Sequence, residues 1–180
     1  SAGTLGYFFS HKLSDFVHNV SVFGVSGMDS ATLLQGRPYG GCAILIRNSL
    51  NCSIIRVNST CKRLVAVVLE IAHVSMLIVN VYFLCDTVYD VAVANQYNDI
   101  LREIELIIES YPQIDCILIG GDFNVDLDRP SLNKPLLLSM CERQSLLSGL
   151  LYRNASVDFT YENEFTRNRS VIDPMIYIYT

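Results

Sequence analysis

The stretch ILIGGDFN, residues 117–124, runs from a short apolar segment through two glycines to a carboxylate and a carboxamide. A buried strand presents polar groups at a sheet edge in this way. If the chain remains extended through Phe123, side-chain alternation places Asp122 and Asn124 on one side and Phe123 on the other. In that case the acid and the amide would be able to meet one phosphate, beside glycines that allow close approach of a ligand. Local physics alone favours an ordinary turn here, because Gly, Asp and Asn all favour turns.

The length and composition indicate one globular domain. A chain of 180 residues suits a single domain over residues 1–180, and no repeat, low-complexity tract or linker divides it. Hydrophobic residues make up 51% and the mean hydropathy is +0.32, which predicts elements buried between layers. The apolar run from Leu64 to Cys85 is interrupted by polar residues such as Glu70, so it lacks the roughly 18 apolar residues of a spanning helix. We expect two consecutive strands there and no membrane partner.

The overall charge does not indicate a tight nucleic-acid binder. The net charge is −5 and the pI is about 5.1, whereas such binders usually carry a basic surface. The late part of the chain is locally more basic, so phosphate contact is expected only at a local rim. A solvated loop face explains the same arginines equally well. They are Arg143, Arg153, Arg167 and Arg169.

The cysteine pattern predicts free thiols. The six cysteines are widely spaced without a Cys-x-x-Cys pair, which favours buried thiols over zinc sites or disulfides. Free thiols fit a reducing compartment. No secretory signal pattern opens the chain, so we expect a nuclear or cytoplasmic location and not secretion. The five Asn-x-Ser/Thr triplets are then chance occurrences.

Hydrophobic patterning predicts the order of elements after an irregular opening. Runs dense in Val, Ile and Leu predict strands, the first four of them close enough to form an antiparallel meander. Apolar residues at helical spacing predict amphipathic helices. Two face-to-face sheets with outer helices would accommodate this order. The expected strands cover 41–47, 54–57, 63–72, 75–83, 114–119, 157–161 and 171–179, and the expected helices cover 89–109 and 132–147.

Three further segments accompany residues 121–124, Gly-Asp-Phe-Asn, in a fixed order along the chain. They are GRPYGGCAILI at 36–46 with GVSGMD at 24–29 before it, NVY at 80–82, and SVID at 170–173. The Gly-Asp-Phe-Asn motif resembles the signature of the endonuclease/exonuclease/phosphatase superfamily. The ordered set resembles the endonuclease domains of non-LTR (LINE-type) retrotransposons within it. These segments span nearly the whole chain, and together they are far more specific than any one of them.

The resemblance implies a fold and a chemistry. The fold would be α+β, a four-layer αββα sandwich of two mostly antiparallel sheets with outer helices. The activity would be metal-dependent cleavage of DNA phosphodiester bonds with Mg²⁺, or with Mn²⁺ as an alternative ion. Hard oxygen ligands suit Mg²⁺. The metal ligands implied in this chain are Asp122 and Asp173.

The resemblance also implies roles for individual residues. Asp122 would orient or activate the attacking water, and Asn124 would hold the phosphate region. Tyr82 would donate towards the phosphate, although an ordinary core tyrosine is the alternative. Asp173 would complete the catalytic set as a terminal acid at the metal or paired with histidine. The substrate-binding residues would be Asn80, which supports Tyr82, together with Arg167, Arg169 and Ser170.

Two departures from the family pattern predict impaired or absent activity. Pro174 follows Asp173 where the family has a histidine that engages the scissile phosphate, and proline has no proton to transfer. The family's opening strands, with the Glu that is its main metal ligand, precede the region matched here, so the domain is expected to lack its first strands. Each loss should lower activity by orders of magnitude, since general acid-base help is typically worth ~10² to 10⁴-fold. Leu84, in place of a family proline, is a minor departure.

Three functions follow from these observations. The first is a retrotransposon-type, Mg²⁺-dependent DNA endonuclease, accompanied on the full-length element by a reverse transcriptase domain and needing no small-molecule cofactor. The second is a catalytically dead binding module or element remnant, favoured by Pro174 and the missing start. The third is a phosphatase of the same superfamily, which is less favoured because residues 36–46 resemble the retrotransposon branch specifically.

Overall fold

The computed structural model describes residues 18–27, 41–85, 90–127, 129–148, 160–162, 167, 169–170 and 176–179. Three sheets occur in this part of the chain. The small sheet pairs β1 (Val20–Val25) with β2 (Cys42–Arg47). The large sheet has the order β3 (Ser53–Val57), β4 (Leu64–Ile71), β5 (Val74–Tyr82), β6 (Cys116–Asp122), β10 (Ile176–Tyr179) and β7 (Leu147–Ser148). A hairpin joins β8 (Tyr161–Glu162) to β9 (Arg169–Ser170), and the helices are η1 (Asn48–Leu50), α2 (Val91–Glu109) and α3 (Asn133–Arg143).

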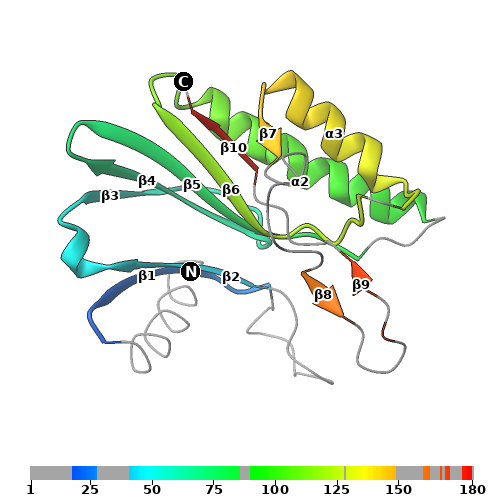
Figure 1. Ribbon diagram of the computed structural model, residues 1–180, viewed down its shortest axis with the longest axis horizontal. Coiled ribbons are helices and arrows are strands. Elements are labelled where there is room, and N and C mark those ends of the chain that lie inside the picture. Colours follow the sequence, from blue (N-terminus) through cyan, green and yellow to red (C-terminus); the bar gives the residue numbers. More distant parts are fainter. Residues whose placement is uncertain are drawn as a thin grey trace.

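The small sheet and the large sheet are stacked face to face (Figure 1). Helices α2 and α3 cover the face of the large sheet that points away from the small sheet. Strand β4 lies in the middle of this stack and is buried on both faces. Alternate residues of β4 enter a core shared with α2 and α3, and the others enter a core shared with β2. The second set consists of Val65, Val67 and Leu69, which pack with Cys42, Ile44 and Ile46. The predicted α+β sandwich is therefore confirmed, while a second outer helical layer remains a prediction.

The sequence signals for helices locate both of them. Helix α2 begins where the Asp90 carboxylate accepts hydrogen bonds from the backbone N–H groups of Ala92 and Val93, at 2.9 and 3.3 Å. Its apolar stripe, including Tyr97 and Ile104, is buried against the large sheet. Helix α3 ends earlier than expected, because Gln144 leaves the helical conformation and Ser145 is left-handed with φ of 53°.

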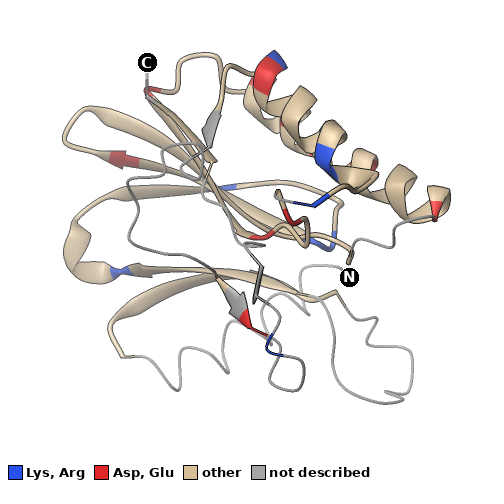
Figure 2. Ribbon diagram, turned by 45° about the vertical axis from the view of Figure 1, so that its right-hand side comes forward, with Lys and Arg blue, Asp and Glu red and all other residues tan. Residues whose placement is uncertain are grey.

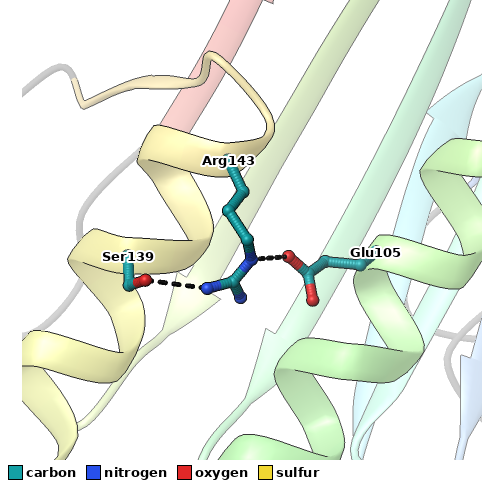
Figure 3. Close-up of polar contacts among 3 residues, drawn as sticks. All are labelled: Glu105, Ser139 and Arg143. Carbon is teal, nitrogen blue, oxygen red and sulfur yellow. Dashed lines mark hydrogen bonds and ion pairs between the residues drawn. The ribbon is translucent and has the colours of Figure 1, made fainter.

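A polar contact joins the two helices on their outer side. The Arg143 guanidinium donates to the Glu105 carboxylate at 2.8 Å and to the Ser139 hydroxyl at 2.7 Å (Figure 3). The hydrogen bond to Glu105 raises the pKa of Arg143 above its ordinary value. Arg143 therefore ties α3 to α2, which leaves less reason to assign it to a phosphate-binding rim.

Most predicted strands are confirmed, and two expectations about the first strands are wrong. The opening segment is not wholly irregular, because β1 forms there and pairs with β2, for example through Val22 and Leu45. Strand β2 also leaves the expected meander and belongs to the other sheet. The η1 turn and Asn51, which is left-handed with φ of 45°, redirect the chain between the two sheets. The meander proper is β3, β4 and β5, all antiparallel.

The later strands agree with the predictions where they are described. Strand β6 starts and ends two and three residues later than expected, at Cys116 and Asp122. It runs parallel to β5, as the crossover through α2 requires. Of the two final predicted strands, 157–159 and 171–175 lie outside the described residues, and Ile176–Tyr179 forms β10. His73 is exposed in the β4 to β5 turn.

The cysteine prediction is confirmed for free thiols and wrong for their burial, since Cys42 and Cys141 are buried, Cys85 is exposed and the other three are half-buried. All six cysteines are free. Burial raises the pKa of the Cys42 thiol to about 12 and that of Cys141 to about 11, so both remain protonated at neutral pH. None of the helices in the described part of the chain has the length and apolar character needed to span a membrane.

A pH test probes the start of the β5 and β6 pair. Asp115 accepts hydrogen bonds from the Ser75 backbone N–H at 2.7 Å and from the Ser75 hydroxyl at 3.0 Å. The backbone hydrogen bond, followed by the hydroxyl, lowers the pKa of Asp115 in the folded state. This stabilisation is fully present above the unfolded pKa of about 3.9 and is lost as pH falls through the lower folded pKa.

We therefore expect Asp115→Asn to reduce the free energy of unfolding at pH 7 and to have a progressively smaller effect below about pH 4. Urea unfolding across a pH series measures this difference. Asp99→Asn is the control, because Asp99 is an exposed residue of α2. A difference that stayed constant down to strongly acidic pH would contradict the assignment.

Candidate active site

The candidate site lies where the parallel strands β5 and β6 end together. Tyr82 is the register partner of Asp122, and Asn80 is the partner of Gly120. The carboxyl ends of parallel neighbours meet at one sheet edge, which brings these motifs together although they are distant in sequence. The structure thus brings Asn80, Tyr82 and Asp122, three of the predicted site residues, to the same edge of the sheet.

Side-chain alternation places Tyr82 and Asp122 on the same face of the large sheet. Tyr82 packs against the core between the two sheets. Phe83 and Phe123, the residues after Tyr82 and Asp122, both enter the opposite core beneath the helices. Because each follows a site residue directly, Tyr82 and Asp122 face the small sheet side by side. Both side chains are half-buried.

Aromatic residues pack together on the helix side of the large sheet, directly behind Tyr82 and Asp122. The Phe83 ring stacks on Tyr97 of α2 at a centroid distance of 4.2 Å and on Phe123 at 5.3 Å. The Tyr97 hydroxyl donates to the Phe123 carbonyl at 3.2 Å. The backbone N–H of Phe83 donates to the Asp122 carbonyl at 2.8 Å. The strand ends that carry Tyr82 and Asp122 are therefore locked to each other and to α2.

The chain does not remain extended through Phe123, so the structure agrees with the turn alternative. Strand β6 ends at Asp122, and Asn124 is left-handed with φ of 50°. Its backbone N–H donates to Asp122 Oδ1 at 2.9 Å, the local side-chain-to-backbone bond that favours Asp in turns. Its side-chain Nδ2 donates to the Phe83 carbonyl at 2.9 Å, and the Cys85 thiol donates to its Oδ1 at 3.5 Å. The chain therefore forms a local turn after Asp122 instead of continuing as a strand. The Asn124 amide stabilises the end of β6 through its hydrogen bond to the Phe83 carbonyl.

Asn80 has a structural contact that the motif did not reveal. Its Nδ2 donates to the Ala43 carbonyl of β2 at 3.0 Å, so this side chain links the two sheets directly behind Tyr82. Its Oδ1 lies close to Gly121, where an added Cβ would be 2.6 Å away. The same Cβ would lie 2.1 Å from the Val81 carbonyl oxygen, and Gly121 has φ of 127°. Only glycine fits at this position.

Arg63 is a site residue that sequence reasoning missed. The Tyr82 N–H donates to the Arg63 carbonyl at 2.8 Å, and the guanidinium carbon lies 5.5 Å from the centre of the Tyr82 ring. The Cys42 thiol donates to the same carbonyl at 3.2 Å. Arg63 directly precedes β4, whose first residue pairs with Val81. The register of the predicted hairpin was the signal that would have placed Arg63 beside Tyr82.

The remaining predicted residues lie apart from this group or are not described. Arg167 is exposed and donates to the Glu162 carboxylate at 2.9 Å across the β8 and β9 hairpin. Arg169 and Ser170 form β9. Figure 1 draws this hairpin below the large sheet. Arg153 and Asp173, with Pro174 after it, lie outside the described residues.

Few charged residues lie on the strands, which are mostly tan in Figure 2. Within the described large sheet the acidic residues are Glu70 and Asp122. Glu70 is exposed at the opposite end of the sheet and accepts from the Ser53 hydroxyl at 2.8 Å. Asp122 is therefore the half-buried carboxylate among the described residues of this sheet, and it is the last residue of β6.

The described residues do not by themselves assemble a metal site. No group of three or more His, Cys, Asp or Glu side chains that could hold a metal ion occurs among them. Asp122 offers a hard oxygen donor of the kind that suits Mg²⁺. The other predicted ligand, Asp173, is outside the described part. Metal binding by this pair remains a prediction.

Comparison with known proteins identifies the fold. A scan against protein-family models gives no match, and a search of curated proteins gives none either. Among solved structures, an endonuclease/exonuclease/phosphatase family protein from Bacteroides thetaiotaomicron has a TM-score of 0.57 at 12% identity, covering 96% of this chain and 64% of that one. The 3′ phosphatase NExo from Neisseria, bound to product DNA hairpin, has a TM-score of 0.58 at 11% identity, with coverages of 98% and 82%.

The chain thus has the fold of the endonuclease/exonuclease/phosphatase superfamily. The endonuclease domain of TRAS1, a telomere-specific non-LTR retrotransposon, is also similar, with a TM-score of 0.65 at 16% identity. That match covers 89% of this chain and 67% of the TRAS1 domain, so the chain spans about two thirds of it. The resemblance to LINE-type endonuclease domains is confirmed at the level of the fold.

The close approach at Gly121 gives a sharp test of the site geometry. We expect Gly121→Ala to lower the free energy of unfolding by about 3 kcal/mol or more, because the Cβ would overlap backbone atoms that cannot move aside. Gly120→Ala is the matched control, since nothing lies within 4 Å of its added Cβ. It should change stability by no more than about 0.5 kcal/mol. Urea unfolding followed by circular dichroism measures both, and equal stabilities would contradict the described contact.

Proposed function

We propose that this chain is a phosphodiesterase-type domain that acts on DNA as a retrotransposon-type endonuclease. The observation that supports it most is the placement of Tyr82 and Asp122 as register partners on one face at the ends of β5 and β6. A phenol and a carboxylate held side by side at an open sheet edge suit a phosphate and an attacking water. The similar fold of the TRAS1 endonuclease domain, and that of a 3′ phosphatase bound to DNA, support this substrate class.

Each residue would contribute a separate part of the reaction. Asp122 would orient the attacking water, and the Tyr82 hydroxyl would donate towards a phosphate oxygen. Asn124 would hold the turn that aims Asp122, through its bonds to Asp122 Oδ1 and the Phe83 carbonyl. A bound Mg²⁺ or Mn²⁺, held by Asp122 and Asp173, would neutralise charge that develops on the phosphate. Asn80 would keep the Tyr82 strand end joined to β2.

DNA would be bound through local contacts, since the chain as a whole carries a net charge of −5. Arg167, Arg169 and Ser170 would supply phosphate contacts from the β8 and β9 hairpin. A reverse transcriptase domain on the same element would be the natural partner of such an endonuclease.

A second candidate function is DNA binding without cleavage. Pro174 stands where the family has a histidine, and it cannot transfer a proton. The Asn124 side-chain amide already donates to a backbone carbonyl, which reduces what it can offer a phosphate. Both observations favour a domain that retains the shape of the site and lacks much of its catalytic power. A phosphatase acting on small phosphate esters has less support, because no described residue favours it over DNA.

A plasmid-nicking assay with Mg²⁺ tests the first candidate. We expect the wild-type chain to nick supercoiled plasmid slowly and Asp122→Asn to lower the rate by at least about 10²-fold. The asparagine keeps an oxygen for the Asn124 N–H, so the turn is retained. Asp126→Asn is the control, because Asp126 pairs with exposed Arg129 at 3.2 Å and has no assigned role. It should leave the rate unchanged.

Equal rates for the wild-type chain and Asp122→Asn would rule out cleavage at this site. Fluorescence anisotropy with a labelled duplex then separates the two candidates. Binding without nicking would support the second function, and the absence of both would reject both.

A further inference from the structure

Arg63 contacts Tyr82 from three directions. The Arg63 carbonyl accepts the Tyr82 N–H at 2.8 Å, and its Nη1 donates to the Tyr82 carbonyl at 3.5 Å. The guanidinium carbon also lies 5.5 Å from the centre of the Tyr82 ring, within the range of a cation-π contact. Both backbone polar groups and the ring of Tyr82 are therefore held by a single residue.

The Arg63 guanidinium contacts both the backbone carbonyl and the ring of Tyr82. The residue is half-buried, and it forms no ion pair with a carboxylate anywhere in the described chain. This contrasts with Arg129, Arg143 and Arg167, which all have acidic partners. A guanidinium is planar and weakly hydrated, so it can lie over an aromatic face where an ammonium fits less well.

The backbone of Arg63 is itself fixed from the other sheet. The Cys42 thiol of β2 donates to the Arg63 carbonyl at 3.2 Å, beside the Asn80 contact to Ala43. Burial raises the pKa of Cys42 to about 12, so this donor keeps its proton at neutral pH. Hydrogen bonds thus hold the Arg63 backbone at the junction of the two sheets, where Arg63 contacts Tyr82.

We infer that Arg63 is a positioning residue for Tyr82 and holds the phenol at the edge beside Asp122. This inference rests on the proposed function for its catalytic consequence, although the contact itself does not. A catalytic donor that is displaced by about 1 Å can lose up to ~10²-fold in rate, so loss of the support should lower turnover and leave substrate binding nearly unchanged.

Three variants test the role of Arg63. Arg63→Met keeps much of the side-chain volume and removes the charge and the planar group. Arg63→Lys keeps the charge on a similar stem. Arg56→Met is the matched control, because Arg56 also donates to a backbone carbonyl, that of Gly24, at 3.0 Å. Thermal unfolding of each variant confirms that it is folded before the other measurements.

The first readout is independent of activity. Tyrosine ring resonances are recorded by NMR with labelled tyrosine, and the Tyr82 signal is assigned by its disappearance in Tyr82→Phe. We expect the Tyr82 ring signal to shift in Arg63→Met, to shift less in Arg63→Lys, and to stay in place in Arg56→Met. An unmoved Tyr82 signal in folded Arg63→Met would overturn the inference, whether or not the chain cleaves DNA.

The second readout is the split between kcat and KM in the plasmid-nicking assay. A positioning role predicts that Arg63→Met lowers kcat about 10-fold with KM for DNA unchanged, and that Arg63→Lys restores part of the loss. A raised KM with unchanged kcat would overturn the inference in favour of direct phosphate contact by Arg63. If the wild-type chain does not nick DNA, the proposed function fails, and the NMR result alone decides the inference.

Discussion

The close approach of β6 to β5 at Gly121 is the constraint on which the site depends. An added Cβ there would meet the Val81 carbonyl oxygen at 2.1 Å, and the backbone has φ of 127°. Because no side chain separates the strands, their parallel pairing continues to the last residues, Tyr82 and Asp122. The hydrogen bond from Phe83 to the Asp122 carbonyl extends that pairing by one more residue. A bulkier residue would push the strand ends apart before the two polar groups met.

The second requirement is the junction between the two sheets. Two side-chain bonds cross from one sheet to the other at the start of β2, one from Asn80 to Ala43 and one from Cys42 to Arg63. Apolar packing of β2 on β4 holds the sheets together over a wider area. The polar bonds lie next to Tyr82, so the same contacts that join the sheets also fix the wall of the candidate site. Stability of the sandwich and geometry of the site are therefore coupled in this protein.

Local patterns predicted the regular elements well. The amphipathic repeat located α2, and the apolar run before the glycines located β6, because both signals act within a few neighbouring residues. The pairing of distant segments was harder. Residues 20–25, VSVFGV, carry the Val and Phe typical of a strand within a segment expected to be irregular, and the partner of β2 depends on a left-handed turn at Asn51 that no apolar pattern encodes.

The site was predictable in its location and less so in its bonding. Motif resemblance assigned Asn80, Tyr82 and Asp122 to one site, and the register brings them to one edge of the sheet. It did not reveal the left-handed Asn124, which local turn chemistry favours, or the contact of Arg63 with Tyr82, which forms only when β4 and β5 are paired. A crystal structure with a duplex oligonucleotide made uncleavable by a modified phosphate is the most direct measurement. A backbone phosphate between the Tyr82 hydroxyl and the Asp122 carboxylate is the predicted result, and a duplex seated instead on the outer surface of α2 and α3 would contradict it.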